Sequence, residues 1–234
     1  MSNELLLIIS VFIYFGLFLV MYKLFGKYGL VVWNVVALLL ANIEVMLLVN
    51  AFGMTMTLGN VAFATSFLVS DLVCEKYDRK TADRIVMLGF IILLAFIAAS
   101  QLWLHFSPAE GDVMMSHFKL VFSNSPRIIF AGLFVYVIVQ LIDVRLYYMW
   151  WGITKKFNKD ESKYLWIRNN GSTLISQLLN AILFNLVAFY GVFSNTDLIN
   201  VIISTYIIYI FTSLIDTPFL YLCRKIKPIN LLDI

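Results

Sequence analysis

Apolar residues form long runs along the chain, and short segments that hold most of the charged residues separate these runs. A helix that crosses a membrane needs roughly 20 mostly apolar residues. The third run is short and carries polar residues such as Asn60, Ser70 and Asp71. The pattern predicts an all-α integral membrane protein with seven spanning helices, or with six if the third run does not cross. The seven runs cover residues 5–22, 29–49, 57–74, 85–105, 127–150, 170–190 and 198–222.

The distribution of basic residues predicts the orientation of these helices, because cytoplasmic loops of membrane proteins are enriched in Lys and Arg. The N-terminus and the loops 50–56, 106–126 and 191–197 hold a single basic residue, Lys119. Fourteen of the 17 basic residues lie instead in the loops 23–28, 75–84 and 151–168 and in the tail after residue 222. We therefore expect the N-terminus outside and the C-terminus inside. Six helices would place loops 23–28 and 75–84 on opposite sides, so the charges favour seven.

The composition agrees with a protein that lies mostly in lipid. Hydrophobic residues make up 62% of the chain and charged residues 13%, whereas soluble domains are about 45–50% apolar and about 25% charged. A soluble globular enzyme and a secreted disulfide scaffold are thereby excluded. The net charge of +3 comes without a dense basic stripe, so no nucleic-acid partner is expected. We predict one multi-pass transmembrane domain over residues 1–234, in the lipid bilayer of the inner or plasma membrane.

Recognisable catalytic and cofactor motifs do not occur in the sequence. It has no HExxH, GxSxG or Walker motif, and no Lys lies in the middle of a run, which excludes a retinal Schiff base. His105 and His117 fall in an outside loop, and Cys74 and Cys223 are expected to be free thiols. The first run lacks the basic segment of a signal peptide, so it should remain as an anchor. We expect neither enzyme activity, nor a cofactor, nor a metal.

Polar residues recur at helical spacing inside four of the runs. A charged group at bilayer depth costs about 2.5–3.5 kcal/mol, so such groups need a partner or a wet cavity. Arg145 lies on a different face from Asp143 and is expected to pair with another helix. The four helical stripes are Asn60, Ala64, Phe67, Asp71 and Glu75 in the third run, Tyr136, Gln140, Asp143 and Tyr147 in the fifth, Asn169, Thr173, Gln177, Asn180 and Phe184 in the sixth, and Thr205, Tyr209, Thr212 or Ser213, and Asp216 in the seventh.

These stripes have two interpretations. Interhelical hydrogen bonds commonly join membrane helices, and that accounts for any single Ser, Thr or Asn. For the fifth and sixth runs together we favour a ligand cavity, because amides and aromatic side chains flank the acid. An amide can match the edge of a flat heterocycle, an aromatic ring can stack on its face, and an acid can hold a ring N–H or an amine. The candidate amides are Gln140, Gln177 and Asn180, the candidate aromatic groups are Phe67, Phe184, Tyr147 and Tyr209, and the candidate acid is Asp143.

Three of these segments resemble the queuosine precursor transporter family, which was formerly grouped with vitamin uptake transporters. They are residues 41–83, which run from ANIEVMLLVNAFG to CEKYDRKTAD, residues 139–147 (VQLIDVRLY) and residues 168–184 (RNNGSTLISQLLNAILF). The resemblance extends from about residue 30 to the C-terminus. It implies import of a 7-deazaguanine base, such as 7-cyano-7-deazaguanine or 7-aminomethyl-7-deazaguanine. The matched motif residues are Asn42, Asn60, Asp71, Glu75, Gln140, Asp143, Arg168, Asn169, Asn170, Ser172, Thr173, Ser176 and Gln177.

Two departures from the family pattern stand out. Asn180 occupies a position where the family usually has Asp, and a neutral amide cannot neutralise a cationic aminomethyl group. The substrate is then a neutral precursor or another base, or Asp143 carries the charge alone. The family's SEKYG is CEKYD in this chain, with Cys74 and Asp78 as the changed residues.

We predict a membrane transporter that imports a queuosine precursor by alternating access. Two alternatives stay open, a substrate-binding subunit of an ATPase-energised vitamin-uptake system and a membrane enzyme without a recognisable motif. The energy source, a homodimer and an energising partner are equally open. The predicted substrate-binding residues are Asn42, Asn60, Asp71, Gln140, Asp143, Asn169, Thr173, Gln177, Asn180 and Phe184.

Overall fold

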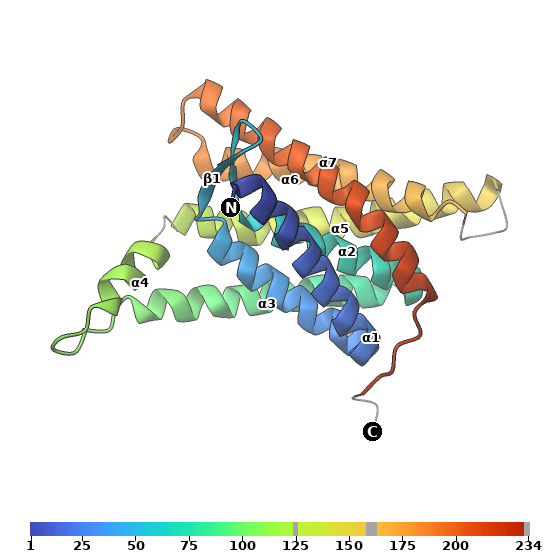
Figure 1. Cartoon of the computed structure of the whole chain (residues 1–234), viewed down its shortest axis with the longest axis horizontal. Helices are drawn as coiled ribbons and strands as arrows, with labels where there is room; N and C mark the ends of the chain where they lie inside the picture. The colour runs from blue at the N-terminus through green and yellow to red at the C-terminus, as the bar shows by residue number, and fades with distance from the viewer. Residues whose placement is uncertain (124–125, 158–162, 232–234) are drawn as a thin grey trace.

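The structure, a computed structural model, describes residues 1–123, 126–157 and 163–231. Within these ranges the chain forms seven helices and one two-stranded hairpin (Figure 1). Lys159, which belongs to the basic loop 151–168, lies outside the described residues. The elements are α1 (Asn3–Glu44), β1 (Leu48–Ala51), β2 (Met54–Thr57), α2 (Gly59–Lys76), α3 (Arg79–Trp103), α4 (Met114–Phe122), α5 (Pro126–Phe157), α6 (Leu165–Phe189) and α7 (Asn195–Lys225).

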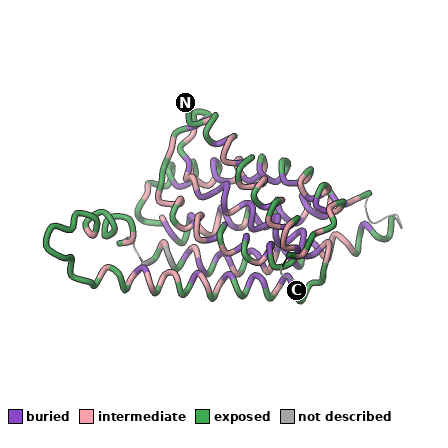
Figure 2. Tube along the Cα trace, turned by 60° about the horizontal axis from the view of Figure 1, so that its bottom comes forward, coloured by how far each residue is buried: buried purple, intermediate pink, exposed green. Residues whose placement is uncertain are grey.

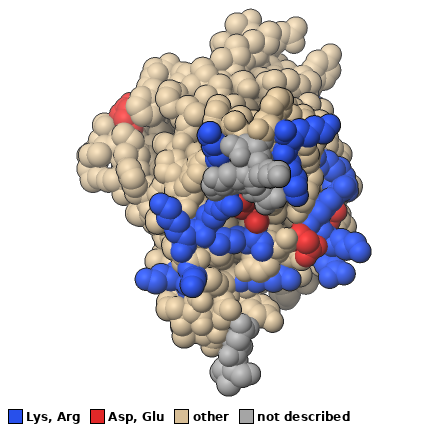
Figure 3. All heavy atoms as spheres, turned by 90° about the vertical axis from the view of Figure 1, so that its right-hand side faces the viewer, with Lys and Arg blue, Asp and Glu red and all other residues tan. Residues whose placement is uncertain are grey.

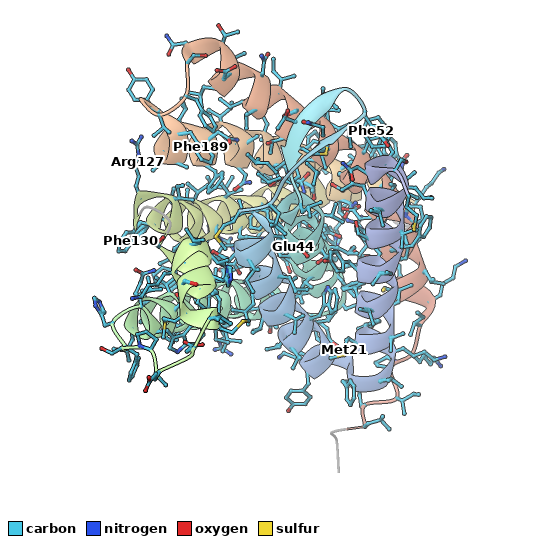
Figure 4. The ribbon with its side chains drawn as sticks, turned by 60° about the vertical axis from the view of Figure 1, so that its left-hand side comes forward. Met21, Glu44, Phe52, Arg127, Phe130 and Phe189 are labelled. Atoms are coloured by element: carbon cyan, nitrogen blue, oxygen red, sulfur yellow. The ribbon has the colours of Figure 1, made fainter. Side chains whose placement is uncertain are left out.

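The helix α1 contains the first two predicted membrane helices, joined by a sharp kink at Gly26. This residue has φ 54° and ψ −126°, a conformation that glycine adopts without the steric cost of a Cβ atom. The two arms fold back against each other, and Tyr14 of the first arm donates a hydrogen bond to Glu44 at the end of the second. Figure 4 shows Met21 near the kink and Glu44 at the opposite end of the second arm. The predicted loop 23–28 is therefore a kink inside one long element.

The C-terminal tail covers this kink. Ile229 N–H donates to the Lys23 carbonyl over 2.8 Å, and Leu231 N–H donates to the Leu24 carbonyl over 2.9 Å. A kink removes helical partners from nearby carbonyls, and the tail supplies replacements. A Cβ atom at Gly26 would lie 2.1 Å from Asn230 Oδ1, so the tail also fills the space that glycine leaves.

Five helices are long and apolar enough to cross a membrane, namely α1, α3, α5, α6 and α7. The 18-residue α2 is different, because 15 of its residues are buried against the surrounding helices. It packs against α1, α3, α5 and α7 in the centre of the bundle, where Figure 2 shows the buried residues gathered. A helix that faces protein on all sides can carry polar residues without exposing them to lipid, which explains the weak third run.

Two connections contain structure that the sequence did not predict. Residues 48–57 form an antiparallel hairpin where a loop over 50–56 was expected, so the protein is helical but not entirely so. Its two-residue turn is Phe52–Gly53, and both residues have positive φ, as a tight hairpin turn requires. The expected loop 106–126 holds the short helix α4, of which no residue is buried (Figure 2). Aromatic contacts of Trp103 with Phe118 and Phe122 hold α4 against the end of α3.

The basic side chains gather at one end of the molecule. Figure 3 looks onto this end, which is the right-hand side of Figure 1. The last turn of α5 contributes Lys155 and Lys156, and the last turn of α7 contributes Arg224 and Lys225. The hairpin and α4 lie toward the opposite end (Figure 1). The bundle therefore has a basic end and an end covered by the hairpin and α4.

Candidate functional site

A cavity lies between α2 and the five long helices, in the half of the bundle near the hairpin and α4. Thr57 of β2 and Phe122 of α4 are part of its wall. Four of the ten predicted binding residues line it, namely Asn42, Asn60, Asn180 and Phe184. The other polar and aromatic side chains of the wall are Phe63, Phe96, Ser100, Tyr136, Asn185, Thr205 and Tyr209.

The amides of this cavity differ in whether their N–H groups already have hydrogen-bond partners. Asn42 Nδ2 donates to the Leu38 carbonyl over 2.9 Å, and Asn180 Nδ2 donates to the Tyr209 hydroxyl over 3.0 Å. Asn60 is 6% exposed, and its Nδ2 has no partner among the described residues. A buried donor without a partner costs about 1–3 kcal/mol, so Asn60 gains from any ligand that accepts its hydrogen bond.

Aromatic rings surround the amides of the cavity. Phe63 is central, with ring centroids 6.3 Å from Tyr136, 6.4 Å from Tyr209 and 5.4 Å from Phe67. Gly132 faces Phe184 and Asn42 with room for a Cβ atom, the nearest atoms lying 3.8 and 4.0 Å away. The wall therefore combines flat apolar faces with amide edges, as a site for a flat heterocycle requires.

Sequence reasoning missed Phe63 and Asn185. Phe63 lies three residues after Asn60 and four before Phe67, so it follows the same helical face, but the stripe was traced through Ala64. Asn185 lies next to Phe184, and its Nδ2 donates to the Ala181 carbonyl over 2.7 Å. Helical spacing contained the signal for Phe63, whereas nothing in the spacing of α6 distinguishes Asn185.

Four other predicted residues form a buried layer of acids and hydroxyls rather than the cavity wall. Thr173 donates to Asp71 over 2.8 Å, and Ser176 donates to Asp143 over 2.7 Å. Asn169 Nδ2 donates to Asp216 over 2.6 Å. The three carboxyl groups are at most 1% exposed. Asp71, Asp143, Asn169 and Thr173 therefore make direct hydrogen bonds to neighbouring helices, as interhelical hydrogen bonding predicts.

Gln140 and Gln177 lie on the same helical faces as the cavity residues, about one turn further from the hairpin. Gln140 Nε2 donates to the Ser66 hydroxyl over 2.9 Å, but its Oε1 has no partner among the described residues. Gln177 is completely buried, and neither Nε2 nor Oε1 has a partner there. A buried amide with both groups open is costly and needs an explanation. A ligand edge that accepts from Nε2 and donates to Oε1 would provide one.

An ionic cluster closes the bundle toward its basic end. Arg168 is 1% exposed and contacts Glu75 Oε2 over 2.8 Å, while Arg224 contacts Glu75 Oε1 over 3.1 Å. Tyr147 donates to the same carboxylate over 2.8 Å, and the Arg168 guanidinium lies 4.6 Å from the Trp151 ring centroid. Tyr147, a candidate stacking group from the sequence, donates to Glu75 and does not line the cavity.

Three further expectations concern side chains outside the cavity. Phe67 is buried but does not line the cavity. Arg145 pairs with Asp83 of α3 over 3.0 Å, which confirms its predicted pairing with another helix. Cys74 and Cys223 are both free and buried.

Comparisons with known proteins agree with the resemblance stated from the motifs. Residues 57–223 match the family described as "Putative vitamin uptake transporter". The chain belongs to this family. A protein of Bacillus subtilis (strain 168) named "Probable queuosine precursor transporter" is 37% identical over 228 residues, which are 97% of either chain. No solved structure matches the chain. The family assignment and the five long apolar helices together support a multi-pass membrane transporter.

Proposed function

We propose that this transporter carries an uncharged 7-deazaguanine base, a precursor of queuosine, into the cell. The observation that carries the proposal is the chemistry of the cavity. Its wall offers amides and aromatic rings, and no charged side chain is among the described residues that line it. Asn42, Asn60 and Asn180 are the proposed edge-binding groups, and Phe63 and Phe184 are the proposed stacking groups. The name of the Bacillus relative, a probable queuosine precursor transporter, supports the same substrate class.

The absence of charge in the wall bears on which precursor is carried. A cationic aminomethyl group moved into a buried site needs a carboxylate partner. Asn180 replaces the family's usual acid, and Asp143 accepts hydrogen bonds from Ser70 and Ser176 outside the cavity wall. We therefore favour the neutral 7-cyano-7-deazaguanine over 7-aminomethyl-7-deazaguanine.

We further propose seven membrane-spanning segments, with the N-terminus outside and the basic end in the cytoplasm. The two arms of α1 count as two segments, and α2 counts as one that is covered by protein. Enrichment of basic residues on the cytoplasmic side supports this orientation (Figure 3). The cavity then lies in the outer half of the bundle. The buried cluster of Glu75, Arg168 and Arg224 closes the inner half, as an outward-facing state of an alternating-access cycle requires.

Isothermal titration of the purified protein with the two bases tests the substrate assignment. We expect binding of 7-cyano-7-deazaguanine at least about tenfold tighter than binding of the aminomethyl base, equal to about 1.4 kcal/mol. Guanine serves as a control that lacks the 7-substituent. Equal, weak binding of all three bases would contradict the proposal.

A further inference from the structure

The buried layer below the cavity contains a pair of carboxyl groups that accept hydrogen bonds from hydroxyls of α2 and α6. Ser70 directly precedes Asp71 in α2, and its hydroxyl lies 3.3 Å from Asp143 Oδ2. Ser176 of α6 donates to Asp143 Oδ1, while Thr173, less than one turn earlier on α6, donates to Asp71 Oδ2. The carboxyl groups of Asp71 and Asp143 therefore lie together between α2, α5 and α6, and both are fully buried.

No cation neutralises this pair among the described residues. The basic groups nearby are committed elsewhere, because Arg168 and Arg224 contact Glu75 and Arg145 contacts Asp83. Two adjacent carboxylates in a low-dielectric environment cannot both be ionised, and the stable arrangement holds a proton between them. Hydroxyl donors reduce the cost of one negative charge, but they do not supply a positive one.

Two unpartnered groups indicate where a proton binds and how water reaches it. Asp71 Oδ1 has no hydrogen-bond partner among the described residues, although it is buried. An oxygen that carries a proton at this position becomes a donor to the neighbouring carboxylate. The second group is Gln177, adjacent to Ser176 and one turn after Thr173, whose amide is buried and open at both atoms. It follows the same α6 stripe that leads up to Asn180 in the cavity wall.

Titratable and charged groups approach the pair from each helix around it. Asp216 of α7 is a further buried acid and accepts from Asn169. Toward the basic end, α2 contributes Cys74 and Glu75, α5 contributes Tyr147 and α6 contributes Arg168. The helix α3 contributes Asp83, which pairs with Arg145, and α1 contributes Tyr22 in the apolar cluster that contains Cys74. Glu75 and Asp83 are paired with arginines, and Asp216 accepts from the neutral amide of Asn169, so none of these groups supplies a positive charge to the pair.

We propose that Asp71 and Asp143 form the proton-binding site of this transporter and that one shared proton is carried inward with each base. The inference rests on the proposed function. In the outward-facing state, the pair takes a proton from water that enters through the cavity, past Gln177. When the cluster around Glu75 opens, water from the cytoplasm reaches the pair and solvates the second negative charge, so the shared proton leaves after the base. The empty carrier returns to the outward-facing state with the hydrated pair deprotonated, and the pair then takes its next proton from outside, with no redox step.

A proton fits this site better than a metal ion. Among the described residues, no group of three or more His, Cys, Asp or Glu side chains is arranged to hold a metal. Hydroxyl groups lie within hydrogen-bond distance of three of the four oxygens of the pair, and a cation would have to replace these contacts. Coupling to sodium instead of protons is therefore the alternative that the transport experiment below separates.

The test uses the full chain in liposomes, with 7-cyano-7-deazaguanine as the probe and the membrane potential clamped at zero. One proton per base predicts an equilibrium accumulation of about tenfold for each unit of pH difference, alkaline inside. Asp71→Asn and Asp143→Asn should still exchange labelled base across the membrane but lose the accumulation. Asp197→Asn, which changes an exposed acid at the start of α7, is the matched control and should accumulate like the wild type.

The outcomes separate the two proposals. Wild-type protein that exchanges the base but ignores the pH gradient overturns the proton site and leaves the proposed function standing. Accumulation driven by a sodium gradient overturns it in favour of a metal cation. Protein that neither binds nor exchanges the base overturns both. If the Asn variants fail to fold, base-dependent proton uptake into dye-loaded liposomes by the wild type decides, with the absence of uptake overturning the inference.

Discussion

Glu75 and Arg168 form a buried salt bridge of 2.8 Å between α2 and α6, and both side chains are almost completely shielded from solvent. Removing one partner of such a pair leaves an uncompensated buried charge, which costs about 3–5 kcal/mol. Glu75 also holds Tyr147 and Arg224, so it connects four helices at one point. The stability of the inner half of the bundle therefore depends on this carboxylate.

Glu75→Gln should lower the free energy of unfolding by about 3 kcal/mol or more, because Arg168 and Arg224 lose their shared anion. Thermal unfolding in detergent measures this effect. The matched control is Asp83→Asn, which removes the exposed partner of Arg145 and should cost less than about 1 kcal/mol. Equal losses for the two variants would contradict a special role for Glu75.

Gln177→Leu should affect binding and stability in opposite directions. Its buried amide has no partner among the described residues, so an apolar replacement should leave the melting temperature unchanged or raise it. Binding of 7-cyano-7-deazaguanine should weaken at least about tenfold, which corresponds to about 1.4 kcal/mol. Calorimetry and thermal unfolding on the same preparation check the pair of effects. A lower melting temperature with unchanged affinity would mean that Gln177 is structural.

Asn180→Asp should change substrate preference. The new carboxylate keeps its place beside the Tyr209 hydroxyl, which can donate to it, and it adds a negative charge to an otherwise uncharged wall. We expect the ratio of affinities to shift toward 7-aminomethyl-7-deazaguanine by about tenfold or more. Competition of the two bases for uptake measures the ratio. Asn185→Asp places the same charge elsewhere in the wall and tests whether position matters, and an unchanged ratio in both variants would sink the explanation.

Gly26→Ala should destabilise the protein by about 1–3 kcal/mol, because its positive φ is strained for alanine and its Cβ atom would collide with Asn230. Gly16→Ala is the control on the same element, since nothing lies within 4 Å of its Cβ position. That variant should be neutral or slightly stabilising. Comparable losses in both would show that the tail does not support the kink.

The helices were predictable because lipid and protein impose different patterns on them. The long apolar runs of α3 and α7 are exposed over much of their surface, as lipid-facing helices are. The polar α2 is instead covered by other helices, and its Asn60, Ser70 and Asp71 weaken its apolar signal. The kink at Gly26 looked like a loop because Lys23 and Lys27 flank it. The hairpin strands have four residues each, too few for alternation to be read from the sequence.

The sequence predicted which helical face carries the candidate site residues, but not which of them line the cavity and which lie in the carboxyl layer. Helical spacing placed Thr173, Gln177 and Asn180 on one stripe of α6, and all three are buried inward. Helical spacing could not show that Asn180 lines the cavity whereas Thr173 donates to Asp71 on α2, because the cavity wall and Asp71 come from other helices. The separation into an uncharged cavity and a carboxyl layer beneath it therefore needed the structure.

The most direct test of the central claim is uptake in a bacterial host that cannot synthesise queuosine precursors and lacks its own importer. The host carries this gene and grows with a low concentration of 7-cyano-7-deazaguanine, and queuosine in its tRNA is measured by mass spectrometry. We predict that the wild-type chain restores queuosine and that Gln177→Leu, present in the membrane at equal amount, restores much less. Wild-type protein that reaches the membrane and leaves tRNA without queuosine would contradict the account.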